Sequence, residues 1–329
     1  MTKNRLKAME GVSRWTWNTL MQKPWAVSIE VTHNCTANCE HCDKGESIPD
    51  EKQASPGDYR RIYDTIRPLV VQISGGEPLL REDILDIVRI MKNPDRLPVI
   101  VFVTNASLLT EEKYQALKGA GVDQFSISLD FPDRRHDDNR RLPGLYNHLN
   151  SLIPRLTAKG NNDITVITAV HKRNYAFLPN MLNVVQKWGA RYNLSMYTAG
   201  RTGNVDLMIT SRNDLKALRK VFDGLIQEMQ KGAPFFSTEP VINRYFQFFK
   251  NNGSFGNCKA GIRSLVVNPD GTLCPCAMKK ITTFDTHGGR IRQFAKTNTC
   301  DQCFVSLRAN TEKPLRELFR DVWATRGSY

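Results

Sequence analysis

Three cysteines near the amino terminus have a spacing that can hold a metal cluster. Cys35, Cys39 and Cys42 form a CxxxCxxC pattern directly after a short apolar run. Three thiolates this close in sequence can bind three irons of a cubane, whereas an ordinary 4Fe–4S cluster takes four cysteines. The remaining iron is then open to a small ligand, which makes it a site for chemistry. The alternatives are a zinc site or buried unpaired cysteines, but a zinc loop usually has paired CxxC or Cys/His arms.

A second group of cysteines lies near the carboxyl end, at Cys258, Cys274, Cys276, Cys300 and Cys303. The segment 269–271, Pro-Asp-Gly, precedes a β-like run and predicts a hairpin turn between the first two of these cysteines. The last two form a CxxC pair. A zinc ribbon, which also combines hairpins with paired cysteines, is the structural alternative for this group.

The composition indicates the cellular compartment of the protein, and thereby the redox state of these cysteines. Hydrophobic residues make up 40% and charged residues 24% of the 329 residues, as in ordinary globular proteins. The sequence has no apolar run of the roughly 20 residues that a membrane span needs, and no signal-peptide pattern. We therefore expect a cytoplasmic protein. Because structural disulfides are rare in reducing compartments, the cysteines point to metal binding.

The net charge of +13 favours anionic partners. The basic residues are spread along the chain and no helix-turn-helix or RNA-recognition signature is found, which argues against nucleic acid. An acidic electron-donor protein and an anionic substrate remain as candidates. The charge-rich segment 133–141 is predicted to be a loop that either clamps such a substrate or is solvated. Trp15, Trp17 and Trp25 in the basic amino-terminal stretch have two interpretations. They suit peripheral contact with an anionic membrane, or a segment that caps the floor of a barrel of the kind described below.

The elements that must position these residues alternate along the chain. Short β-rich runs recur at residues 26–32, 70–74, 99–104, 124–129, 164–170 and 192–197. Helical patterns are predicted over 81–92, over 110–118, and from Ser211 or Asn213 to Gly232. Alternating strands and helices imply βαβ units and a parallel sheet. The fold class is therefore α/β, as in a full or partial barrel whose chemistry lies at the carboxyl ends of the strands.

The alternation stops after residue 233. We expect three regions: a basic, tryptophan-containing extension over 1–25, a barrel over 26–233, and a small cysteine-rich unit over 234–329.

The CxxxCxxC motif, with a ring-bearing residue, His41, before its third cysteine, resembles the signature of the radical S-adenosylmethionine (SAM) superfamily. The second strand run is followed by Gly75-Gly76-Glu77-Pro78, similar to that family's GGEP motif. The resemblance implies a partial (β/α)6 TIM-like barrel in which Cys35, Cys39 and Cys42 hold a 4Fe–4S cluster. In the family the open iron chelates the amino and carboxylate groups of SAM. One electron then cleaves SAM to a 5′-deoxyadenosyl radical that abstracts hydrogen from a substrate.

The resemblance also implies roles for residues at the other strand ends. Ser74, Gly75, Gly76 and Glu77 are expected to bind the methionyl ammonium of SAM. Asn105 lies in Thr-Asn-Ala, where the family often has Thr-Asn-Gly. Ser128 and Asp130 are similar to a polar strand end that contacts the ribose and carboxylate of SAM, and the alternative is that they face a barrel lumen or cap a helix. The segment 197–201 lies near where members place adenine or substrate contacts.

The carboxyl-terminal cysteines resemble the SPASM and shorter twitch extensions of radical SAM enzymes, in which a hairpin between two cysteines begins an auxiliary cluster. On this resemblance Cys258, Cys276, Cys300 and Cys303 hold a second 4Fe–4S cluster, with Cys274 left over. A full SPASM unit normally has about seven cysteines, so five indicate the one-cluster twitch form. Such a fully ligated cluster suits electron transfer and can accept an electron from a product radical.

The predicted activity is therefore hydrogen abstraction from an organic substrate, a metabolite, lipid or tetrapyrrole, giving a two-electron oxidation. Redox-neutral chemistry, such as epimerisation or carbon coupling, is an alternative. A fused leader-binding domain is not expected, because only about 25 residues precede the first strand; a peptide presented by a separate protein stays a second candidate substrate. The competing class is a non-catalytic iron–sulfur or zinc protein. A flavodoxin or ferredoxin, usually acidic, is the expected electron donor.

Overall fold

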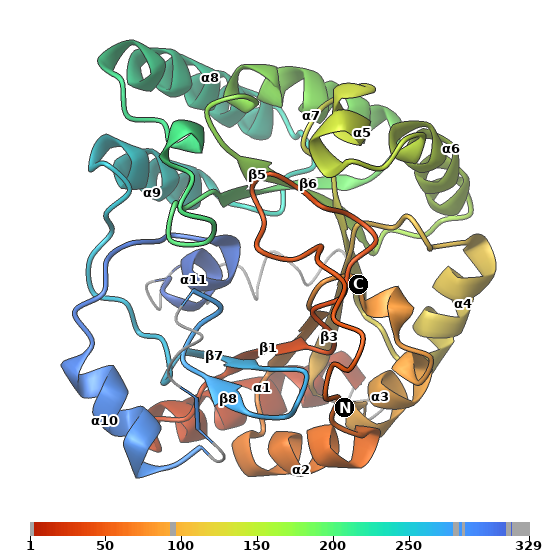
Figure 1. Ribbon diagram of the computed structural model, residues 1–329, viewed down its shortest axis with the longest axis vertical. Helices are drawn as coiled ribbons and strands as arrows, with labels where there is room; N and C mark the ends of the chain where they lie inside the picture. Colours follow the sequence, from red (N-terminus) through yellow and green to blue (C-terminus); the bar gives the residue numbers. More distant parts are fainter. Residues whose placement is uncertain (1–2, 93–96, 279–282, 285–286, 314–316, 318–329) are drawn as a thin grey trace.

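One mixed sheet organises the computed structural model, which describes residues 3–92, 97–278, 283–284, 287–313 and 317 (Figure 1). Its strand order is β6-β5-β4-β3-β2-β1-β7-β8, and every pairing is parallel except that of β7 with β8. The strands are β1 (Ala26–Glu30), β2 (Val70–Ser74), β3 (Val99–Thr104), β4 (Gln124–Ser128), β5 (Ile164–Val170), β6 (Arg191–Met196), β7 (Ser264–Val267) and β8 (Leu273–Cys274). The predicted α/β class and partial barrel are confirmed.

Helices follow the strands and pack outside the sheet, as Figure 1 shows for α2, α3, α4, α6, α7 and α8. The helices are α1 (Lys3–Leu20), α2 (Pro56–Ile66), α3 (Ile84–Met91), α4 (Glu111–Ala120), α5 (Arg135–Arg140), α6 (Leu145–Ala158), α7 (Leu178–Lys187), α8 (Arg212–Gln230), α9 (Glu239–Lys250), α10 (Gly289–Thr297) and α11 (Ser306–Thr311). Short 3-10 turns lie at Pro78–Leu80, Tyr175–Phe177 and Val205–Leu207.

Local sequence signals set several of the helix ends. Ser55 and Asp58 form a capping box at α2, where Pro56 occupies the first turn. The hydroxyl of Thr110 accepts a hydrogen bond from an amide of the first turn of α4, and Ser211 does the same at α8. The prediction over 81–92 is three residues too long at its start, because the Arg81 backbone is extended, with φ −79° and ψ 122°, and the helix begins only at Ile84.

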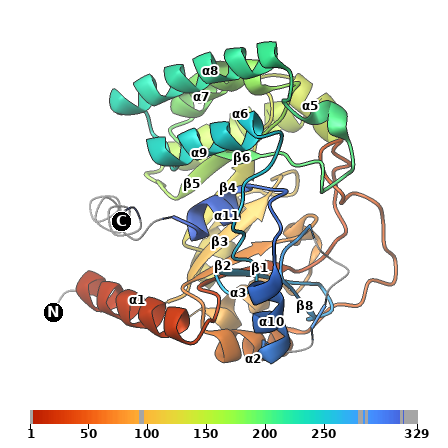
Figure 2. The ribbon, with the colours of Figure 1, turned by 90° about the vertical axis from the view of Figure 1, so that its left-hand side faces the viewer.

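The carboxyl-terminal third completes the sheet. β7 pairs in parallel with β1, and β8 returns antiparallel to it as the predicted hairpin, whose Gly271 adopts a φ of +85°. α11 contacts both β6 and β7 and lies across the opening between them (Figures 1 and 2). The parallel pairing of β7 was not predicted, because four residues in a parallel pairing leave no local turn signal. The boundary at 233/234 stays a prediction, although the sheet continues beyond it.

The amino-terminal helix α1 lies against the start of the sheet. Asn18 is buried and donates hydrogen bonds to the carbonyls of Pro24 and Arg67, both at 3.1 Å. Trp17 is 57% exposed, but Trp25 is buried beside β1 and is not available to a membrane surface. Among the described residues, no helix is both long and apolar enough to cross a bilayer.

A buried arginine ties the loop after β1 to the segment before α2. Arg81 donates to the carbonyls of Val31 and Ala54, each at 3.0 Å, and pairs with Asp83 at 2.7 Å. Its side chain is only 5% exposed. Since no water reaches these carbonyls easily, the arginine is their principal source of hydrogen bonds.

Arg81→Met is expected to lower the free energy of unfolding by about 2–4 kcal/mol, because two buried carbonyls and one carboxylate lose their donor. Urea denaturation measures this change. The matched control is Arg89→Met on the exposed face of α3, where an ion pair with Asp86 is lost and the change should stay below about 0.5 kcal/mol. Equal losses in the two variants would contradict the role given to Arg81.

Candidate active site

The loop after β1, residues 31–42, contains the CxxxCxxC cysteines and is held by the segment that follows it. The Asn34 side chain accepts from the Ile48 amide at 2.7 Å and donates to the Ile48 carbonyl at 3.1 Å. Glu51 accepts a hydrogen bond from the His33 amide at 2.5 Å. The loop therefore has a fixed conformation without regular secondary structure.

The paired glycines after β2 pack against the backbone of that loop. A Cβ at Gly75 would lie 2.1 Å from the Thr32 carbonyl oxygen, and one at Gly76 would lie 2.0 Å from the Asn34 carbonyl oxygen. Gly75 also has a φ of +134°, which favours glycine. The Gly76 amide donates to the Thr32 carbonyl at 2.7 Å. The close approach expected toward a ligand is thus also an approach to the cysteine loop.

Glu77 lies behind the glycines and is fully buried. Its carboxylate accepts hydrogen bonds from the Thr104 hydroxyl at 2.7 Å, the Asn105 amide at 2.8 Å and the Leu79 amide at 3.2 Å. Burial raises the pKa of Glu77 in spite of these donors. Because the carboxylate joins the end of β2 to the end of β3, Glu77 positions its neighbours; its contact with the SAM ammonium stays a prediction.

Asn105, Ser74 and Ser128 lie at the wall of the central cavity, as expected for residues at the ends of parallel strands. The side-chain amide of Asn105 donates to the Thr36 hydroxyl at 2.9 Å and approaches the Cys35 Sγ at 3.7 Å. These contacts bring the end of β3 to the cysteine loop. Their predicted contacts with SAM stay predictions.

Asp130 lies behind the cavity wall and is fully buried. It accepts hydrogen bonds from Arg140 Nε at 2.8 Å and from the Ala169 amide at 3.1 Å, and its contact with Arg140 Nη2 is 2.6 Å. Burial would raise the pKa of Asp130, but the charge of Arg140 holds it well below its usual range. Most of the segment predicted as a loop over 133–141 is the short helix α5, at whose start the Asp133 carboxylate accepts a hydrogen bond from the Arg135 amide at 3.0 Å.

Three buried histidines surround this ion pair. His41 lies 3.8 Å from Asp130 and its ring stacks on that of His171, with 5.7 Å between centroids. His136 Nδ1 accepts a hydrogen bond from the Asp130 amide at 3.1 Å. Burial lowers the pKa of His41 to about 3 and the pKa values of His136 and His171 to about 4. All three rings are therefore neutral near pH 7.

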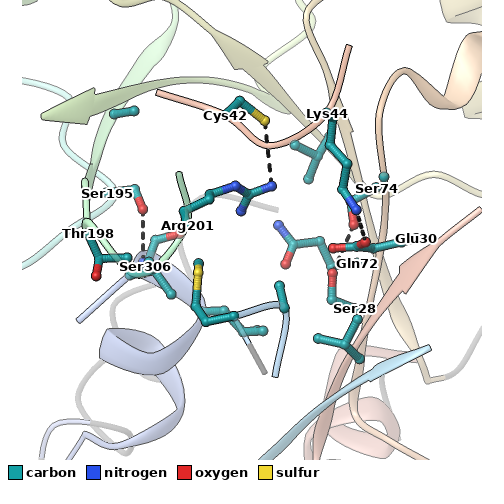
Figure 3. Close-up of a pocket in the computed structure, with 18 of the residues that line it drawn as sticks. Ser28, Glu30, Cys42, Lys44, Gln72, Ser74, Ser195, Thr198, Arg201 and Ser306 are labelled. Atoms are coloured by element: carbon teal, nitrogen blue, oxygen red, sulfur yellow. Dashed lines mark hydrogen bonds and ion pairs between the residues drawn. The ribbon is translucent and has the colours of Figure 1, made fainter. Parts of the chain in front are cut away.

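Cysteines of both groups line one cavity of about 310 Å³ at the carboxyl ends of the strands, part of which is drawn in Figure 3. The expected site residues in its lining are Cys35, Cys39, His41, Cys42, Ser74, Gly75, Gly76, Asn105, Ser128, Cys258, Cys276 and Cys303. Glu77 and Asp130 are not among the lining residues. Groups from the first and last thirds of the chain therefore share one space.

A smaller cavity of about 40 Å³ brings the four predicted auxiliary ligands together. Cys258, Cys276, Cys300 and Cys303 all line it, whereas Cys274 does not. The Cys274 thiol is buried on β8 and accepts a hydrogen bond from the Asn268 side chain at 3.1 Å. None of the eight cysteines, all of which are described, forms a disulfide. The donor set at this cavity fits a cubane cluster with four thiolate ligands.

Burial keeps several of these thiols protonated in the absence of a cation. It raises the pKa of Cys39 and of Cys303 to about 12, and it raises those of Cys35 and Cys258 as well. A bound metal inverts this preference, since a coordinating thiol is deprotonated. Among the described side chains, no three or more His, Cys, Asp or Glu residues are grouped as around a single metal ion.

Three charged residues line the cavity without a role from the sequence reasoning: Glu30 and Lys44 were missed, and Arg201 was noted only as part of the segment 197–201. Lys44 pairs with Glu30 at 2.8 Å, and both side chains are under 10% exposed. Burial would raise the pKa of Glu30, but the hydrogen bond with His33 and the charge of Lys44 lower it. Arg201, after β6, approaches Cys42 Sγ at 3.6 Å (Figure 3). The sequence signal that could have found the Glu30–Lys44 pair is a glutamate at the end of an otherwise largely apolar strand.

Residues 29–182 match the Radical SAM superfamily. The chain therefore contains a radical SAM domain over this range, and the predicted family is confirmed for it. Proteins of this family use a 4Fe–4S cluster and SAM. The matched region contains the cysteine loop, the paired glycines and the ends of β1 to β5.

Two curated relatives and one solved structure illustrate the likeness. An AdoMet-dependent heme synthase of Methanosarcina barkeri is 30% identical over 174 residues, 51% of this chain and 48% of that protein. A PqqA peptide cyclase of Gluconobacter oxydans is 26% identical over 274 residues, 80% of this chain and 73% of the relative. The chain thus spans about half of the heme synthase. Streptococcus suis SuiB bound to its precursor peptide SuiA superposes with a TM-score of 0.60 at 16% identity, covering 95% of this chain and 70% of SuiB, which shows the fold.

Gly76→Ala is expected to displace the cysteine loop, because the added methyl group meets the Asn34 carbonyl, which is backbone. We expect a loss of about 1–3 kcal/mol in unfolding free energy and reduced iron loading, measured by urea denaturation and iron analysis after anaerobic reconstitution. Gly224→Ala in α8 is the matched control: a Cβ there meets nothing within 4 Å, so stability should rise by up to about 1 kcal/mol. Wild-type stability and iron loading of Gly76→Ala would refute the packing role.

The stability of the apoprotein is expected to fall as the pH drops from 7 toward 4. The unfolded chain takes up protons on His136 and His171 below their ordinary pKa of 6.5, whereas the folded chain does so only near 4. Each such histidine contributes up to about 1.4 kcal/mol per pH unit in this window. Urea denaturation at several pH values measures the slope, and His136→Gln should make it shallower. An unchanged slope would show that His136 is not titrating as described.

Proposed function

We propose that this chain cleaves SAM reductively and uses the resulting 5′-deoxyadenosyl radical to abstract hydrogen from an organic substrate. When bound, the reduced 4Fe–4S cluster supplies the electron that breaks the sulfonium bond of SAM. The strongest support is the larger cavity, which is lined by Cys35, Cys39 and Cys42 together with cysteines of the second group. A protein that only carried electrons would not need a ligand-sized space between its two metal sites.

The residues of this chain have separate tasks in the proposal. Cys35, Cys39 and Cys42 would hold three irons and leave the fourth open to the methionyl group of SAM. The backbone at Gly75 and Gly76 lies in the cavity wall beside this loop. Because the Gly76 amide donates to the Thr32 carbonyl, it is the carbonyl groups of this stretch that would meet the ammonium of that ligand. Neutral His41 keeps a second positive charge away from the buried Asp130–Arg140 pair.

The smaller cavity supports an auxiliary 4Fe–4S cluster held by Cys258, Cys276, Cys300 and Cys303. Four cysteines leave no open iron, so this cluster cannot bind substrate without losing a ligand. Accepting an electron from a product radical is the role that suits it, and the net reaction would be a two-electron oxidation. A flavodoxin or ferredoxin would reduce the first cluster, and the net charge of +13 favours such acidic donors.

The substrate would bind against the polar wall of β1 and β2. Ser28 and Gln72 line the cavity there, beside the Glu30–Lys44 pair (Figure 3). Hydroxyl, amide and charged groups can orient a substrate that has polar substituents. A metabolite, a lipid headgroup or a tetrapyrrole side chain has such groups.

A peptide presented by a separate protein is the second candidate. The observation that favours it is the 26% identity to the PqqA peptide cyclase. This match covers 80% of the chain and is the longer of the two sequence matches described above. The same cysteine sites would serve either substrate, so the two candidates differ only in what enters the cavity.

The test is anaerobic reconstitution followed by analysis of iron, sulfide and 5′-deoxyadenosine. The wild type should bind about eight irons and form 5′-deoxyadenosine with SAM and a strong reductant. The triple variant Cys35→Ala, Cys39→Ala, Cys42→Ala should bind about four irons and form none. A quadruple variant lacking Cys258, Cys276, Cys300 and Cys303 should also bind about four irons, but it should retain cleavage of SAM without substrate.

Cys274→Ala is the matched control, since this buried cysteine lines neither cavity. It should load iron and cleave SAM like the wild type. No SAM cleavage by a fully loaded, reduced wild type would refute the proposed function, and bound zinc in place of the second four irons would assign the auxiliary site a structural role.

A further inference from the structure

The segment that follows β6 lies between the two cysteine sites. The Thr198 hydroxyl donates to the carbonyl of Gln302, inside the Cys300–Cys303 turn, at 2.5 Å. Gly200 lines the smaller cavity with the auxiliary cysteines. One residue later, Arg201 Nη2 donates toward Cys42 Sγ at 3.6 Å, the contact drawn in Figure 3. The four-residue segment 198–201 therefore reaches both cysteine sites, the auxiliary site through Thr198 and Gly200 and the first site through Arg201.

The conformation of this segment is fixed by short-range hydrogen bonds. The Arg201 amide donates to the Thr198 carbonyl at 3.1 Å, which makes a tight turn. The Tyr197 hydroxyl donates to the Asn204 carbonyl at 2.8 Å and closes the loop from the other side. Arg201 Nε is also 2.9 Å from the carboxylate of Asp43, the residue after Cys42. The guanidinium is thus held by its own turn and by the cysteine loop.

Arg201 differs from the other polar groups near the first cysteine set. Arg140 also lines the cavity, but its Nε and Nη2 are directed to Asp130. The side-chain amide of Asn105, which lies near Cys35 Sγ, is neutral. Among the described side chains that donate a hydrogen bond to a cysteine of this set, Arg201 is the cationic one.

We propose that Arg201 is a positioning residue that raises the reduction potential of the cluster held by Cys35, Cys39 and Cys42. We also propose that its segment, anchored on the Cys300–Cys303 turn, makes this potential depend on the auxiliary site. The inference rests on the proposed function. Reduction adds one negative charge to the cluster, and an N–H donor or a cation at a ligating sulfur stabilises the more negative state.

The experiment is a redox titration of the reconstituted wild type and Arg201→Gln, followed by electron paramagnetic resonance. The signal that changes when SAM is added identifies the cluster with the open iron. Arg173→Gln is the matched control: it removes an arginine whose guanidinium pairs with the carboxylate of Glu40, in the same loop, rather than with a cysteine sulfur. Iron content and thermal unfolding, measured in parallel, show whether each variant is folded and loaded.

Arg201→Gln should shift the one-electron reduction equilibrium of this cluster at least about tenfold toward the oxidised form, about 59 mV to more negative potential. Arg173→Gln should leave it within the error of the wild type. Equal potentials in the wild type and Arg201→Gln would overturn the proposal. If Arg201→Gln does not load iron, Arg201→Met replaces it, with Arg173→Met as its control. Methionine removes both the charge and the N–H donors, so a lower potential supports the proposal and an equal potential overturns it.

Thr198→Val tests the link to the auxiliary site, since it removes the hydrogen bond to Gln302 without touching Cys42. A smaller shift in the same direction as Arg201→Gln supports the link, and a wild-type potential overturns it. Failure of the proposed function gives a different result: the wild type itself would then show no signal that responds to SAM. A wild type that cleaves SAM but shows no difference between Arg201→Gln and Arg173→Gln refutes only the present inference.

Discussion

The contact between two stretches of backbone, at Gly75–Gly76 and at Thr32–Asn34, is the constraint on which the site depends. Neither stretch can move away without losing the hydrogen bond from Gly76 to the Thr32 carbonyl, and neither glycine can carry a side chain without a clash with the cysteine loop. The parallel pairing of β1 with β2 delivers both stretches to the same edge of the sheet. The cysteine loop is therefore placed by the sheet register through this contact.

Behind this contact the structure keeps its charges in matched, buried groups. Asp130 with Arg140, and Glu30 with Lys44, are ion pairs in which each carboxylate has additional donors. Such pairs are tolerated in a protein interior only when their remaining lone pairs are satisfied. The histidines beside Asp130 stay neutral, so the cavity wall retains a small net charge. A wall of this kind can accept the negative charge of a reduced cluster beside Arg201.

The carboxyl-terminal third has a structural role in addition to supplying five of the eight cysteines. β7 extends the sheet beside β1, and α11 lies across the opening between β6 and β7. These elements close the space that the open sheet alone would leave to solvent. Because Cys303 and Ser306 belong to the same closing segment, the auxiliary site and the cavity wall are built together. This arrangement explains how residues that are more than 200 positions apart in the chain, such as Cys35 and Cys258, line one cavity.

The family, the parallel α/β class and the cysteines that line the two cavities could all be predicted from the sequence. Five of the six predicted strands begin at the predicted residue, and three of them match in full. These features are local: CxxxCxxC, Gly-Gly-Glu-Pro and alternating apolar runs each lie within about ten residues. Four features could be seen only in the folded chain. They are the parallel pairing of β7, the burial of Arg140 against Asp130, the three hydrogen bonds accepted by the Glu77 carboxylate and the approach of Arg201 to Cys42. Each of these joins groups from different elements, and such contacts depend on how strands are ordered and packed, for which a single sequence has no periodic signal.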